Sequence, residues 1–232
     1  MKKSFAYPYG VWLAVFILAP ILMVVVYAFH NADGGFTLHN FSYLPGFLPI
    51  FGRSFWLAFL STVVCLALGY PMAYLMSRLS ASKQSLCMML IMLPMWINFL
   101  LRIIAIRMLL SDNGILNYIL SALNLPNFSI MYTPAAIVIG MVYDYFPFMV
   151  LPIYNALIKI DRNLLDAAGD LGATPARTFR KIIFPLSVPG VISGITMVFV
   201  PSISEFVIAD ILGGGKAVSY THLRAHETLR HL

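Results

Sequence analysis

Long apolar runs dominate this chain, and they restrict it to a small set of folds. Of its 232 residues, 60% are hydrophobic and only 10% are charged, whereas soluble domains carry about 25% charged residues. A helix of about 20 apolar residues crosses a bilayer, and backbone groups in lipid must be hydrogen-bonded within the protein. The runs are too continuous for barrel strands, so we predict an all-α integral membrane protein. Five segments are long enough to span, near residues 10–29, 54–77, 85–110, 133–157 and 187–208.

Basic residues gather on one side of these predicted spans. They lie before the first span, between the second and third, and between the fourth and fifth, whereas the opposite loops, residues 30–53 and 111–132, contain Arg53 alone. The positive-inside rule therefore predicts a cytoplasmic N-terminus that continues into an uncleaved first span. The net charge of +6 follows from this topology and does not indicate binding to nucleic acid. A short amphipathic helix, residues 115–123, is expected at the outer surface.

The polar segment 159–185, between the fourth and fifth predicted spans, carries clear helix start and stop signals. Asp161 is a suitable N-cap for a first helix, and Gly172 can end it in a left-handed conformation. Thr174 and Pro175 then provide an N-cap and a first residue for a second helix, and Pro185 marks entry into the fifth span. Apolar residues recur at helical spacing in both helices, namely Leu164, Leu165, Ala168, Leu171, Phe179, Ile182 and Ile183. We predict a compact helix-turn-helix at the membrane surface, suited to docking a soluble partner.

This segment resembles the cytoplasmic EAA loop of the permeases of ABC importers. The loop reads acidic-Ala-Ala, three residues, Gly, nine residues, then Ile-x-Leu-Pro; Asp166 replaces the usual Glu and Phe184 the usual Leu, which keeps the charge and the bulk. The matching positions are Asp166, Ala167, Ala168, Gly172, Ile182 and Pro185. The resemblance implies a type I ABC importer permease-like helical bundle, with five spans present of an expected six. It also implies that this loop, including Ala173 and Phe179, couples to a separate ATPase.

Several runs within the spans resemble the spermidine/putrescine importer permeases in particular. They are residues 68–74, 94–98, 101–103, 147–152, and Pro201 with 210–214. The resemblance implies polyamine import across a bacterial inner membrane by alternating access. It also implies three protein partners: an ABC ATPase subunit, a second permease and an extracytoplasmic solute-binding protein. ATP and magnesium would be used by the ATPase, so this chain is expected to be no enzyme and to bind no cofactor.

Two other functions remain as alternatives to polyamine import. A related permease for another small solute could share the runs within the spans. A secondary transporter would need no ATPase, but it would leave the capped loop unexplained and would favour an internal repeat, which the sequence lacks.

Two carboxylates, Asp144 and Glu205, fall within predicted spans. Tyr143 and Tyr145 flank the first, Phe206 follows the second, and the third span adds Trp96 and Asn98. Acids beside aromatic rings suit a pathway for cations, through charge attraction and cation–π contact. The alternative is that each acid pairs with an arginine or a backbone group and holds the bundle together. Both interpretations stay open on the sequence alone.

Other polar residues of the spans have simpler expected roles. Arg102 and Arg107 are expected to extend toward the outer surface, and Gly190 and Gly194 to permit close helix packing. The cysteines, Cys65 and Cys87, fall in different apolar segments. No metal site and no catalytic pair is therefore predicted.

The composition changes after Lys216. The following residues are rich in histidine and polar, and the run 219–228 resembles a translated sequencing adapter. We therefore expect a transmembrane permease domain over 1–216, and we expect residues 217–232 not to be native. A metal-binding histidine tail is the functional alternative.

Overall fold

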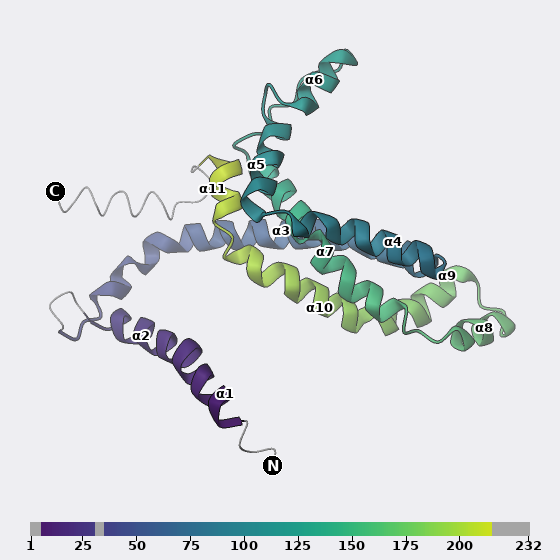
Figure 1. Cartoon of the computed structure of the whole chain (residues 1–232), viewed down its shortest axis with the longest axis horizontal. Coiled ribbons are helices and arrows are strands. Elements are labelled where there is room, and N and C mark those ends of the chain that lie inside the picture. Colours follow the sequence, from purple (N-terminus) through teal and green to yellow (C-terminus); the bar gives the residue numbers. More distant parts are fainter. Residues whose placement is uncertain (1–5, 31–34, 215–232) are drawn as a thin grey trace. The chain divides into compact units, whose positions relative to one another are not determined.

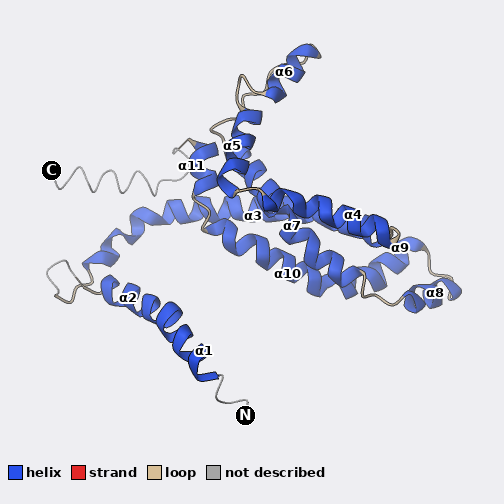
Figure 2. Cartoon of the chain, viewed as in Figure 1, coloured by secondary structure: helices blue, strands red, loops and turns tan. Residues whose placement is uncertain are grey.

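The computed structural model describes residues 6–30 and 35–214, and within these ranges the chain is helical apart from connecting loops and one isolated bridge between His30 and Phe36 (Figures 1 and 2). This confirms the all-α prediction. The predictions for residues 1–5 and 217–232 lie outside the described residues. The α-helices are α1 (Ala6–Leu13), α2 (Ala19–Ala28), α3 (Leu44–Ser77), α4 (Ala81–Met92), α5 (Phe99–Leu110), α6 (Ile115–Ala122), α7 (Pro134–Leu157), α8 (Arg162–Asp170), α9 (Pro175–Thr178), α10 (Phe184–Ile203) and α11 (Val207–Gly213).

Four helical stretches of the described residues are long and apolar enough to cross a membrane. They are Gly10–Ala28, Pro45–Ser77, Pro134–Leu157 and Pro175–Ile203. A fifth span is possible if the bent pair Ala81–Trp96 and Phe99–Ala122 is counted as one. These segments correspond to the five apolar runs of the sequence. The second begins earlier than expected, at Leu44, because Pro45 is compatible with a first helical turn.

The third predicted span, 85–110, is wrong as a continuous helix. Its two halves meet at an angle of 96°. Pro94, which has no N–H to donate, lies in a 3-10 turn, Leu93–Trp96, and Asn98 then caps α5 by accepting from the Leu100 and Leu101 N–H groups at 2.9 and 3.4 Å. Pro94 therefore ends the first half of the segment, and the Asn98 cap starts the second half in a new direction.

The predicted limits of the fifth span, 187–208, and the boundary at Pro185 are also wrong. The helix that begins at Pro175 continues through a π-helical turn, Phe179–Ile183, into α10 without interruption. Within that turn the Phe184 N–H donates to the Phe179 carbonyl, so the hydrogen-bond register shifts just before the proline that has no N–H. The helix then ends at Ile203, before Glu205.

Contacts divide the chain into two units, residues 1–51 and 52–232. In the first unit, the Asn40 side-chain amide donates to the carbonyl oxygens of Tyr27, Ala28 and His30 at 3.4, 3.0 and 3.1 Å. These carbonyls lie at and just beyond the C-terminal end of α2, where backbone acceptors lack helical partners. The Asn40 side chain therefore adds to the backbone hydrogen bonds at the end of the first span.

In the second unit, α7 is the central helix and α10 runs along it (Figure 1). A Cβ atom added at Gly190 would lie 2.6 Å from the Ala156 Cβ and 2.6 Å from the Pro152 carbonyl oxygen, and one at Gly194 would lie 2.9 Å from the Met149 Sδ. Small residues four apart thus bring the two helices close together, as predicted.

Helices α3, α5 and α11 complete this unit around α7. The Gly69 Cβ position is 3.0 Å from the Met149 side chain, and the Tyr70 hydroxyl lies 2.9 Å from the Ser187 Oγ of α10. The surface helix predicted at 115–123 is α6, and it is held by Asn117, which bonds both the N–H and the carbonyl of Phe128 at 2.8 and 3.0 Å.

Replacing Gly190 by alanine should destabilise the bundle, because the new methyl group would overlap the α7 backbone. Overpacking of this kind costs about 1–3 kcal/mol. The matched control is Gly52→Ala in α3, where a Cβ atom would meet nothing within 4 Å. Thermal unfolding of the detergent-solubilised protein should show a lower midpoint for Gly190→Ala alone. Equal midpoints for the two variants would contradict the packing described.

Candidate functional site

The segment 159–185 forms the predicted helix-turn-helix, and its first helix has the expected caps. The Asp161 carboxylate accepts from the Asn163 N–H at 2.9 Å. At the other end Gly172 has φ +74°, the Gly172 N–H donates to the Gly169 carbonyl at 2.8 Å, and the Ala173 N–H donates to the Ala168 carbonyl at 2.9 Å. This pair of bonds is a Schellman motif, which requires a left-handed residue where Gly172 lies.

The second helix is fixed to the membrane-spanning helices. The Thr174 hydroxyl accepts from the Arg177 N–H at 3.4 Å, and Pro175 follows as the first helical residue. Phe179 packs edge-to-face on Tyr70 and Tyr74, with ring centroids 6.0 and 5.3 Å apart. Ile183 is buried and Ile182 half-buried, whereas Pro185 is exposed.

One face of the first helix is left open to a partner. Ala168 is buried and Leu165 packs against the core, but Asp166 and Ala167 are exposed. Leu171, at the tip of the turn, is 88% exposed, and Leu164 is also exposed. Exposed apolar side chains on a rigid, capped turn are typical of a surface that another protein covers.

The membrane-embedded carboxylate Asp144, on α7, is paired. Arg102 of α5 forms a salt bridge with it and also donates to the Pro94 carbonyl at 2.9 Å. The Asp144 residue is only 6% exposed. The expectation that Arg102 extends toward the outer surface is wrong, since a carboxylate on the neighbouring helix offers a closer partner. Arg107, further along α5, is exposed, and its extension toward the outer surface stays a prediction.

Glu205 lies in the short break between α10 and α11 and not within a helical span. Its carboxylate accepts from the Tyr145 hydroxyl at 2.8 Å and from the Val207 and Ile208 N–H groups at 3.0 and 3.2 Å. Within the described parts of the chain, no lysine, arginine or histidine forms an ion pair with it. It is therefore a hydrogen-bonded carboxylate whose charge has no direct counter-ion among those residues.

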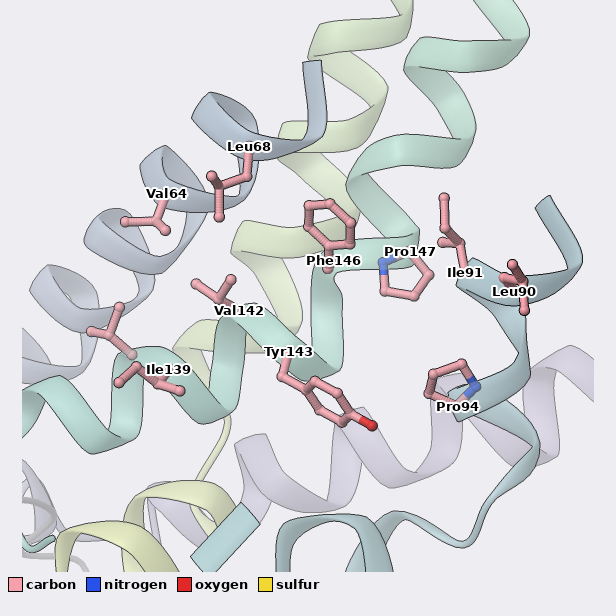
Figure 3. A pocket seen from close by; sticks show the side chains of 11 residues that line it. Val64, Leu68, Leu90, Ile91, Pro94, Ile139, Val142, Tyr143, Phe146 and Pro147 are labelled. Atoms are coloured by element: carbon pink, nitrogen blue, oxygen red, sulfur yellow. The ribbon is translucent and has the colours of Figure 1, made fainter. Parts of the chain in front are cut away.

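The remaining predicted pathway residues are not gathered at this cluster. Trp96 is 85% exposed and Phe206 63% exposed, while Asn98 caps α5. Tyr143 lines an apolar groove of about 500 Å³ together with residues of α3, α4, α7 and the 3-10 turn Leu93–Trp96, among them Val64, Pro94 and Phe146 (Figure 3). The structure thus connects Asp144, Tyr145 and Glu205 with Arg102, a residue that the sequence did not assign to the site. An arginine at mid-span, facing an acid in another span, is the signal that could have identified the pair.

The chain belongs to the family described as the binding-protein-dependent transport system inner membrane component, which its sequence matches over residues 9–229. It is therefore a multi-pass inner-membrane permease subunit of an ABC importer. It is 38% identical over 215 residues to the spermidine/putrescine transport system permease protein PotB of Escherichia coli K12, covering 88% of this chain and 78% of that protein. The PotB protein of Haemophilus influenzae is 37% identical over 219 residues, covering 89% and 76%. These relatives are transport permeases, which confirms the expectation of a transport subunit and not an enzyme.

Solved structures show the same fold at low sequence identity. A bacterial ABC transporter that imports the acidic polysaccharide alginate aligns with a TM-score of 0.70 and 16% identity, over 97% of this chain and 90% of that one. A second structure, of the bacterial alginate transporter in complex with an alginate pentasaccharide-bound periplasmic protein, aligns with a TM-score of 0.67 and 15% identity, over 97% and 89%. The predicted importer-permease fold is thereby confirmed.

Removing Asp144 alone should destabilise the protein strongly, because Arg102 would remain buried without its partner. Breaking a buried ion pair costs about 3–5 kcal/mol, whereas replacing both members with apolar residues is often nearly neutral. We expect Asp144→Leu to lower the midpoint of thermal unfolding in detergent and the double variant Arg102→Met/Asp144→Leu to restore most of it. Arg107→Met is the matched control and should change little. A double variant as unstable as the sum of the single ones would argue against the pair.

Proposed function

We propose that this permease imports polyamines, driven by ATP hydrolysis in a separate subunit. The observation that carries the substrate assignment is the 38% identity to a spermidine/putrescine permease across most of both chains. Spermidine and putrescine are flexible cations at neutral pH. Their pathway therefore needs carboxylates or other hydrogen-bond acceptors that are not already paired with a basic residue of the protein. The charged cluster in the bundle meets that requirement at one position.

Glu205 is the carboxylate that we assign to the pathway. The cluster of Arg102, Asp144 and Glu205 carries formal charges of +1, −1 and −1, and Arg102 pairs with Asp144. The remaining negative charge lies on Glu205, beside the Tyr145 ring and hydroxyl. A protonated amine could replace the missing counter-ion and gain a charge-assisted hydrogen bond. Asp144 serves in this scheme to position α5 against α7. For Tyr143, Phe206, Trp96 and Asn98 a role in the pathway remains a prediction.

The helix-turn-helix 159–185 is the proposed docking site for the ATPase. Its exposed face, with Asp166, Ala167 and Leu171, would fit a cleft of that subunit, and the Schellman turn at Gly172 would keep the face rigid. In this scheme the N-terminus and this segment are cytoplasmic, which agrees with the positive-inside rule. The ATPase would bind ATP and magnesium, and its closure would move the loop and switch the pore between inward- and outward-facing states.

Two further proteins complete the proposed importer. A second permease would form the other half of the pore, and an extracytoplasmic binding protein would deliver the substrate at the opposite surface. For α6, at that surface, two roles stay open: contact with the binding protein and simple anchoring in the interface.

A permease for another small solute is the second candidate. The alginate transporter shares this fold with a chemically unrelated substrate, so the fold does not select among solutes.

Coupling through the loop can be tested at Gly172. Proline fixes φ near −65° and has no N–H, whereas Gly172 has φ +74° and donates to Gly169. Gly172→Pro should therefore abolish co-purification of the ATPase subunit with the permease. Gly169→Ala is the matched control. Neither glycine has an atom within 4 Å of its Cβ position, and of the two only Gly172 has a positive φ. Retained ATPase binding in Gly172→Pro would count against the docking site.

Transport can be tested by expressing the chain with its partner subunits in bacteria that lack polyamine uptake. Labelled putrescine should accumulate, unlabelled spermidine should compete, and energy depletion should stop accumulation. Glu205→Gln keeps the shape of the side chain but removes its charge, so the KM for putrescine should rise by about tenfold, as expected for loss of one hydrogen bond to a charged group. Asp210→Asn, an exposed acid on α11, should leave the KM unchanged.

The outcomes separate the parts of this proposal. An assembled, ATPase-bound complex that accumulates no polyamine would favour another solute. Uptake that Glu205→Gln leaves unaltered would place the amine contacts elsewhere.

A further inference from the structure

A polar cavity of about 520 Å³ lies beside α8, where several membrane-spanning helices end. Its walls come from the last turn of α3, the first turn of α4, the end of α7 and the first two turns of α8. The cavity shares Asp166 with the exposed face of the helix-turn-helix, and none of its lining residues belongs to the charged cluster in the bundle. The proposed transport pathway uses none of its lining residues, and the proposed docking face uses Asp166 but neither arginine.

Two arginines give the cavity a positive charge. Arg78 and Arg162 both line it, and Asp166 is the acid among its lining residues. The formal balance is therefore +1. In the described residues neither arginine forms an ion pair, and the Arg162 side chain has no hydrogen-bond partner. Their guanidinium groups are thus available to an anion.

The position of Arg78 is fixed by its neighbour Tyr74. The guanidinium donates to the Tyr74 hydroxyl at 2.6 Å, and its central carbon lies over the same ring, 4.9 Å from the centroid. This hydrogen bond uses one of the five guanidinium N–H groups, so Arg78 is oriented and keeps donors for a bidentate contact with a phosphate.

Gln84, another lining residue, has its hydrogen bonds satisfied within the chain. The Gln84 amide donates to the Leu79 and Ser77 carbonyls at 2.8 and 3.3 Å, and its oxygen accepts from the Tyr154 hydroxyl at 3.0 Å. Gln84 therefore shapes the cavity and leaves the two arginines as its donors for a ligand.

The depth of the cavity in the membrane identifies the kind of anion. Ser77 and Leu157, both lining residues, are the last residues of two spans, Pro45–Ser77 and Pro134–Leu157. The cavity therefore lies at the level of the lipid headgroups, and apolar residues such as Ile158 and Ile183 border its polar part. Basic pockets between membrane helices at this level suit anionic lipid headgroups.

We propose that this cavity binds one anionic phospholipid, with its phosphate held between Arg78 and Arg162. The Asp166 carboxylate can accept a hydrogen bond from a headgroup hydroxyl, which favours phosphatidylglycerol, with a single negative charge and two hydroxyls. The bound lipid would join the α3–α4 turn to α8 and so fix the base of the helix-turn-helix against the spans. The site is independent of which solute is transported.

The test is lipid retention by the purified full-length chain. The protein in detergent is depleted of lipid, incubated with equal amounts of phosphatidylglycerol and phosphatidylcholine, and examined by native mass spectrometry. We expect one phosphatidylglycerol to be retained preferentially. Arg78→Gln and Arg162→Gln should each weaken that preference by about fivefold, as expected for one basic residue at an anionic membrane surface. Lys83→Gln removes the same charge from the same end of the bundle without lining the cavity and should have no effect.

Three results would overturn the proposal. The first is equal retention of phosphatidylglycerol by the wild type and both arginine variants. The second is displacement of the lipid by inorganic phosphate, with phosphate itself retained, which would identify a free anion as the occupant. The third is loss of ATPase-subunit binding in Arg78→Gln with lipid retention unchanged, which would assign the cavity to an acidic segment of that partner. Because Arg78 lies in the turn after α3 and Arg162 lies on α8, misfolding of one variant leaves the other as a test.

Discussion

The close contact between α7 and α10 is the constraint on which the rest of the second unit depends. In a bilayer there is little hydrophobic gain from bringing two apolar helices together, so shape and hydrogen bonding must hold them. Gly190 and Gly194 allow the two backbones to approach, and α3, α5 and α11 then pack around the pair. The salt bridge between Arg102 and Asp144 then joins α5 to this central helix.

Pairing inside the membrane also decides which polar groups are available for function. A charge in hydrocarbon is costly unless a partner neutralises it. Asp144 forms a salt bridge with Arg102. Glu205 is held by hydrogen bonds alone. Two acids that look alike in the sequence therefore differ in environment, because Arg102 on α5 pairs with Asp144, whereas no basic residue in the described part of the chain pairs with Glu205.

The sequence predicts well those features that short-range rules determine. Asp161, Thr174 and Gly172 act where they were expected, because a cap depends on a few neighbouring residues. The apolar runs were also located, since their length follows from the bilayer. The sequence left open an arginine partner for Asp144 but did not identify Arg102 as that partner, because the two residues are 42 positions apart and their contact depends on how the broken third segment packs. The sequence analysis ended the helix at Pro185, because proline has no N–H to donate to the preceding turn. The π-helical turn before Pro185 shifts the hydrogen bonds, and the helix continues.

That uninterrupted helix has a mechanical consequence. Pro175–Ile203 comprises 29 residues and is about 43 Å long at 1.5 Å per residue. One end begins at the Thr174 cap, and the other ends just before Glu205. A rod of this length converts a small tilt at one membrane surface into a displacement of several ångströms at the other. The Thr174 cap and the break that holds Glu205 thus lie at the two ends of one helix, and in the proposed scheme a movement of the first would displace the second.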